Sequence, residues 1–92
     1  MQTLTILGAT GSIGISTLDV AARHPDRFAI FALSCHSKIV DLAEQCRKFK
    51  PLYAVVSDSS KVDELKKLLE LDCPDTEVLS GVDGLSFVAS AP

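Results

Sequence analysis

The chain has no apolar run long enough to cross a membrane and no excess of basic residues. A membrane-spanning helix needs roughly 20 predominantly apolar residues in a row, and no segment approaches that length. Nine Lys and Arg against twelve Asp and Glu give a net charge of −3, which argues against the basic face that binds nucleic acid. The N-terminus also lacks the basic and then apolar order of a signal peptide. We therefore expect a cytoplasmic protein with neither a membrane nor a nucleic-acid partner.

The chain has three cysteines, and their spacing fits neither a disulfide framework nor a zinc site. Cys35, Cys46 and Cys73 are odd in number and form no C-x-x-C pair, so we expect reduced thiols with packing or loop roles. His36 follows Cys35, but adjacent residues leaving a strand point to opposite faces, which disfavours a nucleophile and base pair. No metal site can be identified in the sequence.

Strand-like and helix-like segments alternate along the whole chain, which we expect to form one domain over residues 1–92. This order predicts an α/β fold, a Rossmann-like parallel sheet with flanking helices that is one half of a doubly wound fold. The first three strands would lie in the order 3-2-1, and the fourth beside strand three or strand one. The predicted strands are 3–7, 28–34, 53–56 and 77–80, and the predicted helices are 12–23, 38–48, a segment capped at 58–60 that runs to 71, and 82–90.

Helical spacing of apolar residues predicts which face of each helix packs on the sheet. For the first helix the predicted inner residues are Ile13, Thr17, Val20 and Ala21. For the second they are Ile39, Leu42, Ala43, Cys46 and Phe49, and for the third Val62, Leu65, Leu68 and Leu69.

The most informative motif is a glycine turn between the first strand and the first helix. Gly8 would allow the turn, Gly11 would let a phosphate approach the backbone, and Gly14 would let the helix lie close to the strand. The free N–H groups and positive dipole end of the helix can then hold an anion. The hydroxyls of Thr10 and Ser12 could donate to phosphate or cap the helix. An ordinary strand-to-helix turn is the alternative, whereas a P-loop is disfavoured because no Lys-Ser/Thr pair follows.

The end of the second strand lacks the carboxylate that binds the adenosine ribose of NAD. No acid occurs there before Asp41, whereas Ser37 and Lys38 could bind a 2′-phosphate, so the sequence favours NADP over NAD. Lys38 could instead be an ordinary solvated residue in a first helical turn. His36 could stack on adenine or face solvent.

The stretch 4–14 and the block 16–20 that follows it resemble the N-terminus of the 1-deoxy-D-xylulose 5-phosphate reductoisomerase family. The resemblance covers essentially the whole chain. It continues in the segments Ala32-Leu33, Glu44-Gln45-Cys46, 51–55 and Thr76-Glu77-Val78-Leu79-Ser80-Gly81.

This resemblance implies an enzyme that rearranges and reduces 1-deoxy-D-xylulose 5-phosphate to 2-C-methyl-D-erythritol 4-phosphate in the non-mevalonate route to isoprenoids. It implies NADPH as hydride donor, a divalent metal (Mg or Mn), a homodimer, a bacterial source and inhibition by fosmidomycin-type phosphonates. The implied phosphate-binding residues are Thr10, Gly11, Ser12 and Ile13. A second NADPH segment falls on His36-Ser37-Lys38, where many members have Gly-Lys-Asn.

Members of that family are several times longer than 92 residues, and their metal ligands, substrate-phosphate site and lid would lie beyond position 92. We therefore expect an N-terminal NADPH-binding part, inactive alone, whose first strand has an open edge that favours self-association. Two alternatives are a cofactor domain of another NADP-linked enzyme, such as aspartate-semialdehyde dehydrogenase or an extended short-chain dehydrogenase, and a non-enzymatic NADP-sensing module.

Overall fold

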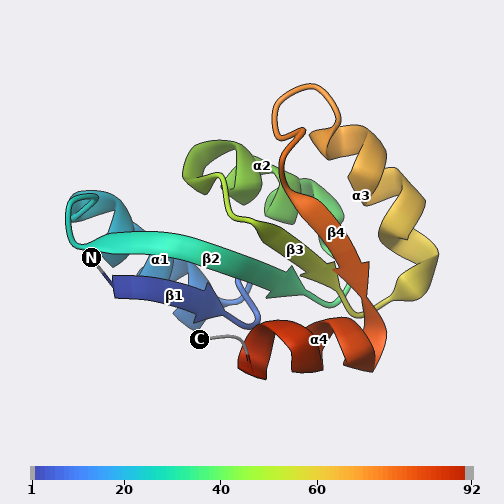
Figure 1. Cartoon of the computed structure of the whole chain (residues 1–92), viewed down its shortest axis with the longest axis horizontal. Coiled ribbons are helices and arrows are strands. Elements are labelled where there is room, and N and C mark those ends of the chain that lie inside the picture. The colour runs from blue at the N-terminus through green and yellow to red at the C-terminus, as the bar shows by residue number, and fades with distance from the viewer. Residues whose placement is uncertain (1, 91–92) are drawn as a thin grey trace.

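Four parallel strands form one sheet in the order β1-β2-β3-β4 (Figure 1). The computed structural model of the chain describes residues 2–90. Its strands are β1 (Gln2–Ile6), β2 (Phe28–Cys35), β3 (Tyr53–Val56) and β4 (Glu77–Ser80), and its helices are α1 (Ser12–Arg23), α2 (Ile39–Phe49), α3 (Val62–Leu69) and α4 (Gly81–Ser90). The predicted Rossmann-like α/β arrangement and the 3-2-1 order of the first three strands are confirmed.

The fourth strand, whose neighbour the sequence left open, pairs with β3. Ala54 lies opposite Val78, and Val56 lies opposite Ser80. The two edge strands of the described sheet are therefore β1 and β4.

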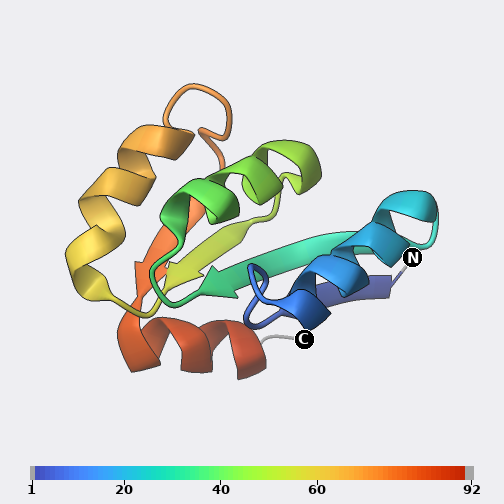
Figure 2. The ribbon, with the colours of Figure 1, turned by 180° about the vertical axis from the view of Figure 1, so that it is seen from behind.

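The helices divide unequally between the two faces of the sheet (Figures 1 and 2). α1, α2 and α3 cover one face, and α4 covers the carboxyl-terminal part of the other. The larger core, under the three helices, includes Ile6, Leu18, Leu33, Leu42, Val56 and Leu65. The smaller core joins Val88 of α4 to Ala32 and Val55 of the sheet. None of the helices within residues 2–90 is both long and apolar enough to span a membrane.

The predicted inner faces of α2 and α3 are confirmed. All the predicted inner residues of α2 are buried except Phe49, which is partly buried and packs on the same core. In α3, Leu65 and Leu69 are buried, and Val62 and Leu68 pack against the core from its margin.

The predicted inner face of α1 is largely wrong. Gly14, Leu18 and Ala21 are the buried residues, whereas Ile13 is 84% exposed and Val20 is 52% exposed. Apolar residues lie on several sides of this helix, so their spacing does not define one face. The glycine at position 14 decides the orientation because it lets the helix approach the preceding turn.

Several predicted element boundaries also differ from the structure, most by a single residue. β1 ends at Ile6, which leaves Leu7 in the turn. A short 3-10 helix (Ser59–Lys61) precedes α3 because Asp58 accepts a hydrogen bond from the Ser60 amide and the Lys61 amide bonds to the Asp58 carbonyl. α3 itself ends at Leu69, two residues earlier than predicted.

Candidate functional site

The glycine turn joins β1 to α1 at the carboxyl edge of the sheet. Gly8 has φ +69°, in the left-handed region that favours glycine. Its amide donates to Ser34 Oγ at 3.0 Å, and the Ala9 amide donates to the Ser34 carbonyl at 2.7 Å. The Gly11 amide closes the turn on the Gly8 carbonyl at 3.0 Å. The turn is therefore tied to the end of β2.

Gly14 and Gly11 differ in how much room the chain leaves for a side chain. A Cβ at Gly14 would lie 2.4 Å from the Gly8 oxygen and 2.7 Å from the Ala9 Cα, so only glycine fits. This confirms the close approach predicted for Gly14. A Cβ at Gly11 would meet the Gly8 oxygen at 3.4 Å, an ordinary contact. The packing of the chain itself does not require glycine at position 11.

The start of α1 presents unused backbone donors. The first bond of the helix runs from the Ile15 amide to the Gly11 carbonyl at 2.9 Å, so the amides of Ser12, Ile13 and Gly14 precede the helical ladder. The cap residue Gly11 has no side-chain cap, and the first turn contains no acid. The capping role considered for Thr10 and Ser12 is therefore not seen. These amides and the helix dipole favour an anion at this point.

The loop between β2 and α2 holds the second group of predicted site residues. His36, Ser37 and Lys38 are all exposed. The loop is fixed by neighbouring backbone, since the Asp58 amide donates to the His36 carbonyl at 3.0 Å and the Ile39 amide donates to the Ser37 carbonyl at 2.8 Å. Lys38 is the first flanking residue of α2 and makes no side-chain cap.

Ser37 and Lys38 line a cavity of about 650 Å³ between α2 and α3. Lys61 and Lys67 also line it, together with Asp41 and Glu64. Neither of these two lysines was predicted from the sequence. The predicted order of parallel strands could have indicated Lys61, because the loops after adjacent strands meet at one edge of the sheet.

Asp58 is a third residue near the site that was not predicted from the sequence. It follows β3, and its carboxylate accepts from the Ser60 hydroxyl at 2.6 Å and from the Ser60 amide at 3.1 Å. These bonds hold the pKa of the Asp58 carboxyl below its ordinary value, with smaller contributions from Lys61 and His36. An anionic carboxylate therefore lies beside the loop of His36.

A separate cavity of about 460 Å³ lies between the glycine turn and α4. Gly8, Ser34 and His36 contribute to it from one side, and Leu85 and Ser86 of α4 from the other. The structure thus brings the glycine turn and His36 to one cavity, whereas Ser37 and Lys38 line another. Thr10, Gly11, Ser12 and Ile13 lie at the start of α1 and line neither cavity.

The cysteines are buried and do not provide a nucleophile. Burial raises the pKa of the Cys35 thiol to about 11 and that of Cys46 to about 12, so both are protonated near neutral pH. Cys73 is also buried. Cys35 packs in the core while His36 is exposed, as expected for adjacent side chains that leave a strand toward opposite faces.

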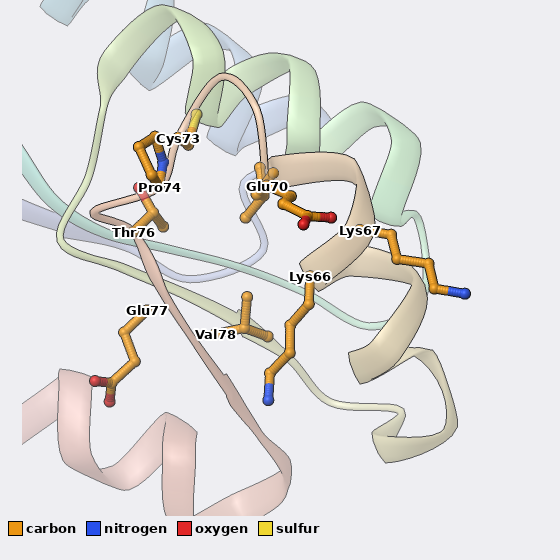
Figure 3. Close-up of a pocket in the computed structure, with 9 residues that line it drawn as sticks. Lys66, Lys67, Glu70, Cys73, Pro74, Thr76, Glu77 and Val78 are labelled. Atoms are coloured by element: carbon orange, nitrogen blue, oxygen red, sulfur yellow. The ribbon is translucent and has the colours of Figure 1, made fainter.

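A third cavity, of about 640 Å³, lies between α3 and β4 (Figure 3). Lys66 extends alongside Val78, whereas Lys67 and Glu77 point away from each other. Glu70 adds a further acid, so the lining has mixed charge and does not concentrate positive potential. Within residues 2–90, no three His, Cys, Asp or Glu side chains lie together as a metal ion would require.

The chain matches a protein family over almost its full length. The family model for 1-deoxy-D-xylulose 5-phosphate reductoisomerase matches residues 4–92. The enzyme of that name from Janthinobacterium sp. (strain Marseille) is 51% identical over 92 residues, covering 100% of this chain and 24% of the relative. The enzyme of that name from Stutzerimonas stutzeri is 54% identical over 89 residues, covering 97% of this chain and 22% of the relative.

Solved structures of the same enzyme have the same fold. The Zymomonas mobilis reductoisomerase in complex with NADPH superposes with a TM-score of 0.89 at 39% identity, covering 96% of this chain and 23% of that chain. A reductoisomerase in complex with NADPH, fosmidomycin and magnesium gives a TM-score of 0.90 at 40% identity, covering 98% of this chain and 22% of that chain. The chain thus spans less than a quarter of the length of these relatives. It belongs to the 1-deoxy-D-xylulose 5-phosphate reductoisomerase family.

Proposed function

We propose that residues 1–92 form the N-terminal NADPH-binding part of a 1-deoxy-D-xylulose 5-phosphate reductoisomerase. That enzyme converts 1-deoxy-D-xylulose 5-phosphate to 2-C-methyl-D-erythritol 4-phosphate in non-mevalonate isoprenoid biosynthesis. The observation that carries the proposal is the start of α1, where backbone amides with no helical partner follow a turn fixed to Ser34. Such a site suits the pyrophosphate of a dinucleotide.

The residues of this chain fit NADPH in two places. Thr10, Gly11, Ser12 and Ile13 would hold the pyrophosphate, largely through backbone amides. Room beside the Gly11 Cα, which the packing of the chain leaves open, supports close approach of a phosphate. When bound, NADPH supplies the hydride for the reduction.

Ser37 and Lys38 would hold the 2′-phosphate that distinguishes NADPH from NADH. Lys61 and Lys67 line the same cavity and raise the local positive potential. Asp41 and Glu64 line the cavity as well, and their negative charges limit that potential. We assign the direct contact with the phosphate to Lys38 and a supporting role to Lys61.

Other features of the whole enzyme remain part of the proposal. We place it in the bacterial cytoplasm as a homodimer that uses a divalent metal, Mg or Mn, held by residues outside this chain. The 92 residues alone would bind cofactor without turnover. An assay of NADPH oxidation with 1-deoxy-D-xylulose 5-phosphate tests this, and turnover by the isolated chain would contradict it.

Calorimetric titration with NADPH and NADH, at low and moderate salt, tests the cofactor assignment. We expect NADPH to bind more tightly than NADH. Its affinity should fall as salt rises, because ions screen the charged contacts to the phosphates. A folded sample that binds neither dinucleotide would contradict an independent half-site. Equal binding of both would contradict the role of Ser37 and Lys38.

A further inference from the structure

The peptide groups of the glycine turn are held from outside the turn by two side chains. Ser34, which is buried at the end of β2, accepts from the Gly8 amide through its hydroxyl. Gln45 of α2 reaches across 36 positions of sequence, and its Nε2 donates to the Ala9 carbonyl at 2.8 Å. Ala9 is completely buried, so its carbonyl has little access to water as an alternative partner.

The bond from Gln45 leaves a polar atom without a partner. Gln45 Oε1 is buried and has no hydrogen-bond partner within the described part of the chain. The amide cannot simply be reversed, because its oxygen would then face the Ala9 carbonyl oxygen. An apolar side chain of similar size would avoid this unpaired atom but would lose the donor to Ala9. The bond to Ala9 thus fixes the turn at the cost of one buried oxygen without a hydrogen bond. Such a cost is typical of a functional constraint.

These contacts account for the polar groups of the turn one by one. The amides of Gly8, Ala9 and Gly11 are occupied by Ser34 or by the turn itself, and the Ala9 carbonyl is occupied by Gln45. The unused amides are those that start α1. The direction in which they point depends on the peptide planes of Gly8 and Ala9, which Ser34 and Gln45 fix.

We propose that Gln45 is a positioning residue for the pyrophosphate of the dinucleotide. It acts through Ala9, holding the turn so that the unused amides of Ser12, Ile13 and Gly14 converge on one anion. It touches neither the phosphate nor the nicotinamide. This inference rests on the proposed function, because it needs the dinucleotide to lie at the glycine turn.

Two substitutions separate this role from general stabilisation. Gln45→Met keeps the size of the side chain and removes the donor. Gln45→Glu keeps a donor only when the carboxyl is protonated, since an ionised carboxylate accepts hydrogen bonds and cannot donate them. Lys66→Gln is the control for charge. It lowers the net charge by 1, as Gln45→Glu does when its carboxyl is ionised, but on the exposed side of α3, away from the turn.

The measurement is the affinity of each variant for NADP⁺, which tolerates acid, from pH 5 to pH 8. Gln45→Met should bind about tenfold more weakly than the unsubstituted chain at every pH, a loss equivalent to 1.4 kcal/mol. Gln45→Glu should bind poorly at pH 8 and recover toward the unsubstituted chain at pH 5, because burial against the Ala9 carbonyl oxygen raises the pKa of the introduced carboxyl above its ordinary value. Adenosine 2′-monophosphate, which has no pyrophosphate, should bind all variants alike, and Lys66→Gln should follow the unsubstituted chain.

Binding of NADP⁺ by Gln45→Met within twofold of the unsubstituted chain would overturn the inference. Binding by Gln45→Glu at pH 8 within twofold of the unsubstituted chain would overturn it as well, because the ionised carboxylate cannot donate to Ala9. If Gln45→Met does not fold, the pH series of Gln45→Glu decides within one folded protein. If the unsubstituted chain itself does not bind NADP⁺, the proposed function fails for this chain. Amide chemical shifts of 10–13 in Gln45→Met then test the positioning alone, and unchanged shifts would overturn it.

Discussion

Among single residues, Gly11 and Gly14 at the start of α1 differ in what requires a glycine at each position. Gly14 touches the backbone of Gly8 and Ala9 so closely that any Cβ displaces main-chain atoms. Gly11 has an ordinary φ of −82° and room for a Cβ. The packing of the chain therefore requires glycine at position 14 but not at position 11, where we propose that a phosphate of the dinucleotide approaches the backbone.

Replacing each of these glycines by alanine should give opposite results. Gly14→Ala should lower the free energy of unfolding by about 2 kcal/mol or more, because overpacking against backbone is poorly relieved. Gly11→Ala should cost less than about 1 kcal/mol, the loss of a good N-cap residue, but should weaken NADPH binding. Urea unfolding and calorimetry measure the two effects. A Gly11→Ala chain with unchanged NADPH affinity would contradict the assigned approach of phosphate.

The buried thiols predict a loss of stability at alkaline pH. Burial raises the pKa of Cys35 to about 11 and that of Cys46 to about 12, whereas an unfolded thiol titrates at about 8.5. A raised folded pKa contributes stability that is complete below the unfolded pKa and is lost as pH rises through the folded pKa. The free energy of unfolding should thus decline from about pH 8.5 upward.

Urea unfolding at pH 8 and pH 10 measures this decline. Cys46→Ala is the control, because it removes one of the two thiols and should make the decline shallower. An equal slope in both proteins would show that other groups cause the alkaline loss.

At the scale of elements, the structure shows which parts of the fold follow from local sequence. The order of strands and helices and the apolar faces of α2 and α3 were predictable, because periodicity and breakers such as Pro51 act locally. The face of α1 was not, because a contact between Gly14 and the turn outweighs the spacing of Ile13 and Val20. The position of β4 was also not predictable, since pairing with β3 depends on contacts distant in sequence.

The candidate site shows the same division between local and distant contacts. The glycine turn is visible in the sequence because its donors are consecutive residues. The contributions of Ser34, Gln45 and Lys61 come from other elements and become visible only when the sheet brings their ends together. The residues that we propose to contact the phosphates were therefore predictable from the sequence, whereas the residues that hold the turn in place were not.

The packing of α2 predicts a large effect of one substitution. Leu42 is completely buried in the larger core, so Leu42→Ala should lower the free energy of unfolding by about 2–5 kcal/mol. Val40, two positions earlier on the same helix, is 60% exposed, and Val40→Ala should change the free energy of unfolding by less than about 0.5 kcal/mol. Chemical denaturation of both variants tests this, and similar losses would contradict the observed orientation of α2.

At the scale of the whole molecule, β1 has only β2 as a partner in the described sheet. An open parallel edge invites pairing with another chain, so the isolated 92 residues should self-associate as concentration rises. Thr3 is exposed on this strand, and Thr3→Lys should reduce the association because a charge on an edge strand opposes pairing. Sedimentation equilibrium measures the association of the unsubstituted chain and of Thr3→Lys. An unsubstituted chain that stays monomeric at all concentrations would contradict association through the β1 edge.

We propose that the start of α1 and the loop after β2 bind the two phosphate-bearing parts of NADPH. The most direct test is to follow the backbone amide resonances of the chain during titration with NADPH. We expect NADPH to shift the amide resonances of Thr10, Ser12 and Ile13 and those of Ser37 and Lys38. NADH should leave the resonances of Ser37 and Lys38 unchanged. Shifts confined to the cavity between α3 and β4, or none near α1 despite binding, would contradict it.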